Sequence, residues 1–148
     1  VFTRFDVYPQ WKVEIEKRFD FKNVIVWVKN NHTAGDLDGN FGYQHEFIIY
    51  ATKGRHILRG PRQTNVWYAA RVYDGIHPTQ KPVELYENAI IASSDQGDLV
   101  LDPFFGSGTC GVASRGLKRR FLGFETDPRY FESATKRISG AAQTVLFT

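Results

Sequence analysis

The sequence contains no methionine and only one cysteine, Cys110. A single cysteine cannot close an internal disulfide or build a thiolate metal cluster, and this favours a reducing, cytoplasmic compartment. The four histidines are scattered without the spacing of metal ligands, so we expect no metal site. A translated chain normally begins with methionine, whereas this one begins with Val1-Phe2-Thr3, which has the composition of a strand already under way. We therefore expect a fragment of a longer protein.

Long apolar runs are absent as well. No run approaches the roughly 18 residues that a membrane-spanning helix needs, and the N-terminus lacks the charged-then-apolar pattern of a secretory signal. With 42% hydrophobic and 24% charged residues, the composition is that of a folded globular chain. The 148 residues suffice for one domain whose core needs no disulfides. The sequence thus predicts a soluble protein that is neither secreted nor embedded in a membrane.

A strong excess of one charge is also lacking, because 19 basic residues face 16 acidic ones and leave a net charge of only +3. That balance is too small to identify a nucleic-acid-binding protein by itself. The distribution is less even, since the stretch from Lys53 to Arg71 contains no acidic residue and includes Trp67 and Tyr68. Such a stretch can contact phosphates and stack on bases, although a solvated surface loop has the same composition.

The first half of the chain alternates apolar runs with polar, glycine-containing segments. Trp11, Ile15 and Phe19 recur at helical spacing, which indicates an amphipathic helix. The run from Val24 to Val28 is apolar throughout and mostly β-branched, as is typical of a strand covered on both faces. We expect strands at 1–5, 24–28 and 45–52, and a long loop at 29–44.

Helix signals and short apolar runs alternate in the second half. Pro82 suits the first turn of a helix, and Asp127 followed by Pro128 has the pattern of a helix N-terminus. The order strand, helix, strand, helix predicts parallel pairing and an open α/β sandwich. We expect helices at 82–94, 109–115 and 128–140, a buried strand at 99–101 and a second strand at 121–124.

Gly106, Gly108 and Gly111 form a G-x-G-x-x-G pattern between a predicted strand and a predicted helix, and Glu125 follows 19 residues after Gly106. This spacing fits dinucleotide-binding proteins, so an NAD-dependent oxidoreductase is one interpretation. Asp102 opposes it, because a carboxylate at the end of the strand would repel a pyrophosphate. S-Adenosylmethionine carries a ribose and an ammonium group but no phosphate, and it suits Asp102 and Glu125 better. A third interpretation is a glycine turn that only packs strand on helix.

Two segments resemble the cofactor motifs of the DNA amino-methyltransferases, which methylate adenine N6 or cytosine N4. One is Leu101-Asp102-Pro103-Phe104-Phe105-Gly106-Ser107-Gly108-Thr109, which is similar to the family's glycine-containing motif. The other is His77-Pro78-Thr79-Gln80-Lys81-Pro82, one helix upstream, which is similar to the second cofactor motif. Segments 27–31 and 41–47 are also similar to family sequence, so the resemblance covers nearly the whole chain. It implies an α/β fold, a Rossmann-like S-adenosylmethionine-dependent methyltransferase sandwich with a partial sheet.

The resemblance also implies roles for individual residues within one incomplete methyltransferase domain. Glu125 would hold the ribose of S-adenosylmethionine, and Lys81 would pair with the carboxylate of its methionine end. The family's permuted order implies that 1–52 belong to the catalytic half, that 53–75 form a short target-recognition stretch, and that 76–148 form the cofactor half. The implied cofactor-binding residues are His77, Thr79, Lys81, Asp102, Phe104, Gly106, Gly108, Thr109 and Glu125.

The family's catalytic loop, Asp/Asn/Ser-Pro-Pro-Tyr/Phe/Trp, has no counterpart, because no two prolines are adjacent in the sequence. Methylation of an exocyclic amine needs acceptors for its N–H protons and an aromatic ring that stacks on a flipped base. We expect this loop upstream of Val1, together with the central strand of the sheet, and we expect the isolated chain to be inactive. The target base is left open, and adenine N6 is favoured only by its frequency in the family.

The partner that the resemblance implies is double-stranded DNA, and a homodimer is left open. Aromatic residues of the long loop are candidates to stack on a flipped base. The non-enzymatic alternative is a remnant or nucleic-acid-binding module that keeps the fold without the chemistry. The DNA-binding candidates are Lys29, Phe41, Tyr43, Arg55, Arg59 and Arg62.

Overall fold

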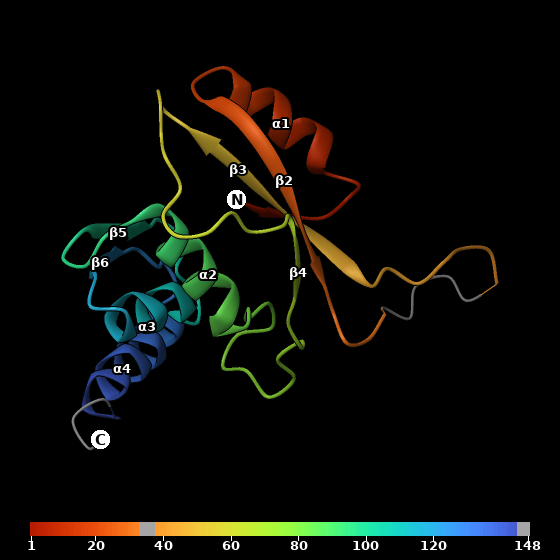
Figure 1. Cartoon of the computed structure of the whole chain (residues 1–148). Coiled ribbons are helices and arrows are strands. Elements are labelled where there is room, and N and C mark those ends of the chain that lie inside the picture. The colour runs from red at the N-terminus through yellow and green to blue at the C-terminus, as the bar shows by residue number, and fades with distance from the viewer. Residues whose placement is uncertain (33–37, 145–148) are drawn as a thin grey trace. The chain divides into compact units, whose positions relative to one another are not determined.

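The computed structural model describes residues 1–32 and 38–144, and the chain divides into two compact units, Val1–Arg71 and Val72–Thr148 (Figure 1). Each unit contains its own strands and helices. In the described part of the chain, no helix has both the length and the apolar character that crossing a membrane requires.

The first unit is a four-stranded sheet with one helix. Its elements are β1 (Phe2–Thr3), α1 (Tyr8–Glu16), β2 (Asp20–Val28), β3 (His45–Thr52) and β4 (Val66–Tyr68). The strands lie in the order β1-β3-β2-β4, and β3 pairs antiparallel with both of its neighbours, whereas β2 and β4 are parallel. The helix α1 packs against β2 and β3. The expected strand at 45–52 is thus confirmed, and the expected strand at 1–5 is reduced to two residues.

Trp27 is the centre of the core of this unit. Its side chain is 1% exposed, and its Nε1 donates a hydrogen bond to the carbonyl of Ala69 at 2.8 Å. On β3, Ile48 and Ile49 are both buried, so both faces of that strand take part in packing. The expected burial of 24–28 holds for Trp27 only, and the other four residues are half-buried. In this unit α1 packs against β2 and β3.

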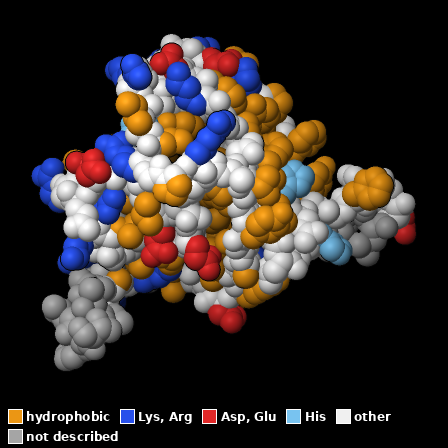
Figure 2. Space-filling model, in the orientation of Figure 1, with side chains coloured by type: hydrophobic (Ala, Val, Ile, Leu, Met, Phe, Trp, Pro, Cys, Tyr) orange, Lys and Arg blue, Asp and Glu red, His pale blue; other side chains and the backbone are white. Residues whose placement is uncertain are grey.

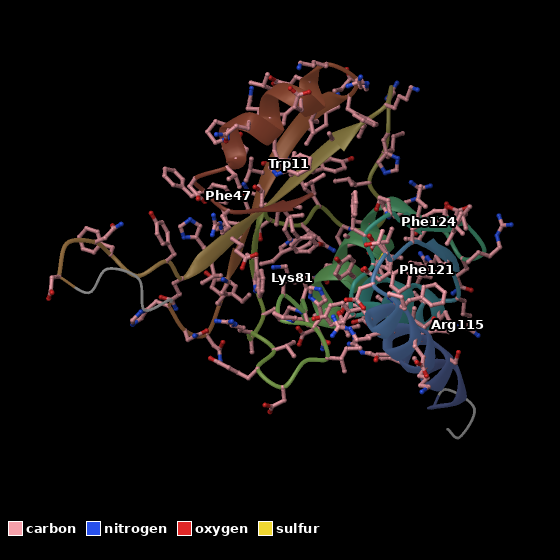
Figure 3. All side chains as sticks on the ribbon, turned by 180° about the vertical axis from the view of Figure 1, so that it is seen from behind. Trp11, Phe47, Lys81, Arg115, Phe121 and Phe124 are labelled. Carbon is pink, nitrogen blue, oxygen red and sulfur yellow. The ribbon has the colours of Figure 1, made fainter. Side chains whose placement is uncertain are left out.

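The helix α1 is shorter and more exposed than the spacing predicted. It ends at Glu16, so Phe19 lies beyond it, and both Trp11 and Phe19 are exposed. The ring that faces the sheet is Tyr8, whose centroid lies 5.6 Å from that of Phe47 on β3. Figure 3 labels Trp11 on this helix and Phe47 on the strand. Tyr8 lies in the first turn of α1. The predicted pattern of Trp11, Ile15 and Phe19 begins after this turn and therefore missed Tyr8.

The outer face of α1 carries charged pairs one turn apart. Lys12 Nζ lies 2.6 Å from Glu16 Oε1, and Lys17 Nζ lies 2.5 Å from Glu14 Oε1. Figure 2 shows basic and acidic side chains interleaved over this helix. These exposed pairs keep the outer face polar, but each contributes little to stability.

The second unit packs three helices against two parallel strands. Its elements are α2 (Val83–Ser93), β5 (Leu99–Asp102), α3 (Thr109–Gly116), β6 (Arg120–Gly123) and α4 (Pro128–Thr144). The helix α3 lies between α2 and α4 and also contacts both strands. The predicted parallel pairing is confirmed here, because β5 and β6 run parallel from the Leu99–Arg120 pair to the Asp102–Gly123 pair.

The described residues cover only one face of this two-stranded sheet. Leu99 and Leu101 are 54% and 58% exposed, so the expected burial of this strand is wrong. Side chains alternate along a strand, and in this unit helix residues pack on the face that carries Val100 and Phe121. The residues that pack together on the covered face are Val83, Tyr86, Ile90, Val100, Cys110, Ala113, Leu117 and Phe121.

Candidate cofactor site

The glycine turn, residues 105–109, connects β5 to α3 and is the first feature of the site. Gly106 and Gly108 have φ angles of +49° and +74°, in the left-handed region that glycine adopts without steric cost. The N–H of Gly108 donates to the carbonyl of Phe105 at 2.7 Å and closes the turn. Gly108 is the N-cap of α3, which begins at Thr109. The turn therefore has no side chain at its two left-handed positions.

The third glycine of the pattern, Gly111, has a different task. A β-carbon at Gly111 would lie 2.5 Å from Ile138 Cδ1 and 2.9 Å from Phe121 Cε1. The absence of a side chain lets α3 approach both α4 and β6 closely. The packing interpretation of the glycine pattern thus holds for Gly111, whereas Gly106 and Gly108 shape the turn.

Asp102 ends β5 and is half-buried just before the glycine turn. Its Oδ1 accepts a hydrogen bond from the N–H of Phe104 at 3.1 Å. Burial raises the pKa of the Asp102 carboxyl, the hydrogen bond from Phe104 opposes that rise, and the charge of Glu125 adds to it. An ammonium group beside Asp102 would remove much of this penalty, because an opposite charge stabilises the ionised form.

Glu125 lies at the corresponding end of the neighbouring strand. The register pairs Asp102 with Gly123, and the N–H of Phe124 donates to the carbonyl of Asp102 at 3.0 Å. Glu125 follows immediately in the chain. The two carboxylates are thus brought to one edge of the sheet by parallel pairing.

Three backbone N–H groups hold the Glu125 carboxylate. Its Oε2 accepts from Gly106 at 3.0 Å, and its Oε1 accepts from Thr126 and Asp127 at 2.8 and 2.9 Å. The bond from Asp127 is the main reason that the pKa of Glu125 is lowered, and the bonds from Thr126 and Gly106 add to the effect. Glu125 is therefore an ionised acceptor whose direction is fixed by the glycine turn itself.

His77 brings the second predicted motif to the same place. Its ring centroid lies 4.4 Å from that of Tyr130, and a β-carbon at Gly106 would lie 3.7 Å from its Cδ2. Its Nδ1 accepts from the N–H of Thr79 at 3.2 Å and lies 3.0 Å from the Thr79 Oγ1. The nearby His77 ring also makes a small contribution to the lowered pKa of Glu125. The structure therefore joins two motifs that α2 separates in the sequence.

Phe104 and Lys81 are predicted residues at the margin of this group. Phe104 adjoins the glycine turn, and its side chain is 86% exposed. Lys81 directly precedes Pro82, the N-cap of α2, and is half-buried (Figure 3). Their roles toward a cofactor stay predictions.

Two residues of α4 belong to the group, although the sequence did not single them out. The Tyr130 ring packs against His77 at an interplanar angle of 58°. Arg137 donates from Nη1 to the carbonyl of Ser107 at 2.9 Å and to the Oγ1 of Thr109 at 3.0 Å. Helical spacing was the signal in the sequence that could have found Arg137. It lies between the inward-facing positions 134 and 138 of the helix that follows Glu125.

The DNA-binding candidates all lie in the first unit, and the structure gives one of them a different task. Lys29 is 8% exposed, and its Nζ lies 2.7 Å from Glu46 Oε1 and 5.2 Å from the centroid of the Trp27 ring. A phosphate contact would have to break this buried ion pair, so the role predicted for Lys29 is disfavoured. The remaining candidates are partly or fully exposed: Phe41, Tyr43, Arg55, Arg59 and Arg62.

The ends of β5 and β6 define a class of ligand by their donors and acceptors. Asp102 offers a carboxylate to an ammonium group, and Glu125 offers one to hydroxyl groups. A pyrophosphate does not suit this set, because the Asp102 carboxylate at the strand end would repel it. The left-handed glycines between the acids leave room for a ligand to approach the backbone. These features suit a nucleoside that carries no phosphate better than they suit a dinucleotide.

Comparison with known proteins then identifies the family. Residues 7–136 match the DNA methylase family, and the chain belongs to this family. It is 34% identical over 147 residues to the type II methyltransferase M2.DpnII of Streptococcus pneumoniae, a match that covers 87% of this chain and 55% of that protein. The chain spans little more than half the length of the first curated relatives that it matches.

Solved structures agree with this assignment. The crystal structure of the M1.HpyAVI–SAM complex has a TM-score of 0.79 and 32% identity, over 92% of this chain and 71% of that one. The PvuII DNA methyltransferase, described as cytosine-N4-specific, has a TM-score of 0.75 at 16% identity over 93% of this chain and 62% of that one, which is a likeness of fold alone. The family resemblance and the methyltransferase-type α/β fold expected from the sequence are both confirmed.

Proposed function

We propose that this chain is part of an S-adenosylmethionine-dependent DNA amino-methyltransferase and carries its cofactor site. The observation that carries the proposal is the placement of Asp102 and Glu125 at adjacent strand ends, with Glu125 bonded to the N–H of Gly106 inside the glycine turn. Membership of the DNA methylase family supports DNA as the substrate. The similar protein M1.HpyAVI is described as a complex with SAM, which supports the cofactor.

Each acid of the site has a separate task in this proposal. Glu125 accepts hydrogen bonds from the ribose hydroxyls, because three backbone N–H groups already keep it ionised and oriented. Asp102 pairs with the α-ammonium group, and Lys81 pairs with the carboxylate of the methionine end. When bound, S-adenosylmethionine supplies a methyl group on a sulfonium centre that is open to nucleophilic attack.

The remaining groups of the site give it its shape. Gly106, Gly108 and Thr109 provide the backbone surface, and His77 with Thr79 closes one side of it. Phe104, whose ring is exposed beside the turn, covers the ligand. All the residues that these tasks need are present in the chain.

The target is proposed to be adenine N6 in double-stranded DNA, on the frequency of that activity in the family. In this proposal 1–52 belong to the catalytic half, 53–75 contact DNA and 76–148 hold the cofactor. No Asp/Asn/Ser-Pro-Pro-aromatic sequence occurs in the chain, so we expect the 148 residues alone to bind cofactor without transferring methyl groups. Labelled methyl groups in DNA after incubation with the chain would contradict that expectation.

Calorimetric titration of the chain with S-adenosylmethionine and with NAD tests the proposal. We expect binding of S-adenosylmethionine that weakens by about tenfold or more in Asp102→Ala, because a charged hydrogen bond is lost. Asp74→Ala removes an exposed acid of the same unit and serves as the matched control. Tight binding of NAD without a response to S-adenosylmethionine would overturn the proposal. DNA binding without any cofactor response would favour the non-enzymatic module instead.

A further inference from the structure

The helix α4 forms the back of the glycine turn. A β-carbon at Gly108 would lie 3.0 Å from both Ala134 Cβ and Ile138 Cδ1, so the turn rests directly on the helix. Ala134 is fully buried, and Ile138 is nearly so. The packed surface fixes the distance between α4 and the turn, but apolar contacts alone do not fix the direction of the polar groups of the turn.

Arg137 supplies directional contacts at this surface. Its Nη1 donates both to the carbonyl of Ser107 at 2.9 Å and to the Oγ1 of Thr109 at 3.0 Å, and it therefore spans Gly108. The Oγ atoms of Ser107 and Thr109 lie 3.0 Å apart and complete the network. Ser107 and Thr109 are both buried, so these groups depend on partners within the protein.

The hydrogen bonds of the Arg137 guanidinium to the glycine turn account for its position. Among the described residues Arg137 forms no salt bridge, although it is half-buried, and burial lowers its pKa. A half-buried cation costs free energy unless its N–H groups are well bonded. The bonds that offset this cost are those to the glycine turn. Arg137 also lies one residue beyond the segment 7–136 that matches the family.

We propose that Arg137 is a positioning residue that holds the glycine turn in its ligand-accepting shape before the cofactor arrives. Glu125 bonds the N–H of Gly106 from the β6 side, and Arg137 bonds residues 107 and 109 from the α4 side. The turn is therefore tied at both ends, and ligand binding does not have to order it. The effect on affinity rests on the proposed function, whereas the effect on the turn does not.

Affinity for S-adenosylmethionine, measured by calorimetry at a temperature where all variants are folded, tests the first effect. We expect Arg137→Ala to weaken binding by about tenfold and Arg137→Lys to weaken it less, because an ammonium group keeps the charge without the planar fork. Lys136→Ala removes the neighbouring, exposed cation, which bonds Glu132, and should leave affinity unchanged. Unchanged binding by Arg137→Ala would overturn the inference and leave the proposed function intact.

A double-mutant cycle separates positioning from general destabilisation. Thr109→Val removes the hydroxyl that Arg137 bonds, so Arg137→Ala should cost less affinity in that background than in the natural chain. Equal losses in both backgrounds would contradict an action through the turn. If Arg137→Ala does not fold, Arg137→Lys takes its place in the cycle. Its loss of affinity should then be smaller in the Thr109→Val background than in the natural chain.

Amide hydrogen exchange of the ligand-free chain distinguishes this inference from the proposed function. We expect faster exchange at Gly108 in Arg137→Ala than in the natural chain or in Lys136→Ala, with unchanged exchange in β2 and β3. If the natural chain does not bind S-adenosylmethionine, the proposed function fails, but faster exchange still supports the role of Arg137 in holding the turn. Unchanged exchange at Gly108 overturns that role.

Discussion

The two units of the chain differ in where they place their polar contacts. In Val1–Arg71, an antiparallel ladder between β2 and β3 carries a core around Trp27, and the buried ion pair of Lys29 with Glu46 lies within it. In Val72–Thr148, one group of polar contacts lies where strand ends, the glycine turn and α4 meet, and another joins Arg119 to Ser94 near the start of the strands. The first arrangement stabilises a scaffold, whereas the first group of the second unit places the carboxylates of Asp102 and Glu125 beside the glycine turn.

This difference shows why a binding site can be assigned to one unit and not to the other. The acids of the second unit keep lone pairs beside a turn whose two left-handed positions have no side chain, and their positions follow from hydrogen bonds. The exposed basic and aromatic residues of the first unit have no such common geometry among the described residues. Their proposed DNA contacts therefore depend on charge rather than on shape.

Trp27→Ala should have the largest effect and tests whether the first unit is a scaffold. The change removes a side chain that is 1% exposed and leaves the carbonyl of Ala69 without its indole donor. We expect the free energy of unfolding to fall by about 3–5 kcal/mol, measured by urea denaturation with circular dichroism. Phe41→Ala, at a side chain that is 94% exposed, should change it by less than about 0.5 kcal/mol. A loss below about 1 kcal/mol for Trp27→Ala would show that this core does not hold the unit.

Gly111→Val tests the close packing of the second unit and ranks next. A β-carbon at this position already lies 2.5 Å from Ile138 Cδ1, and a branched side chain adds further overlap between α3, α4 and β6. We expect a loss of about 1–3 kcal/mol in the free energy of unfolding. Gly116→Ala in the same helix meets no atom within 4 Å and should stay within about 0.5 kcal/mol. Equal effects of both changes would mean that Gly111 is not required for packing.

The features that the sequence predicted correctly are those set by neighbours along the chain. Asp102 follows an apolar run, the two left-handed glycines follow Asp102, and Glu125 ends the next strand, so local pattern and parallel pairing suffice to place them. The position of His77 beside the turn came from the family resemblance, since α2 separates it from the glycine motif.

The features that the sequence did not predict depend on contacts between distant segments. Arg137 reaches the turn only because Ala134 and Ile138 dock α4 onto it. Lys29 meets Glu46 because strand register places β2 beside β3. Leu101 was expected to be buried, but an apolar run shows only that a strand can be covered, and not which of its faces the helices cover.

The pH dependence of cofactor affinity is a smaller effect with a defined sign. Burial raises the pKa of Asp102 in the folded, ligand-free chain above its value in the unfolded chain, so the folded state holds the proton more tightly. As the pH rises from the unfolded pKa through the folded pKa, Asp102 therefore lowers the stability of the fold. Binding of an ammonium group needs the ionised carboxylate. Affinity for S-adenosylmethionine should therefore fall as the pH drops below the raised pKa, by at most about tenfold per pH unit.

Asp102→Asn provides the reference for this measurement, because other carboxyls of the chain titrate in the same range. Calorimetric titrations at several pH values should show a steeper loss of affinity on acidification for the natural chain than for Asp102→Asn. Glu125 should not contribute to this loss near its usual range, because backbone hydrogen bonds, first that of Asp127, lower its pKa. Equal slopes in both proteins would show that Asp102 does not bind the ammonium group.

Salt dependence of DNA binding should show the smallest effect and tests the first unit. Arg55 and Arg62 are exposed in the basic stretch, whereas Arg4, also exposed, pairs with Asp6 outside it. If Arg55 and Arg62 each neutralise one phosphate, replacing either with alanine should reduce the slope of log K against log salt by about one, as measured by fluorescence anisotropy with a duplex. Arg4→Ala should leave the slope unchanged. A reduction of equal size for Arg4→Ala would mean that DNA responds to the charge of the whole unit and that the stretch has no special role.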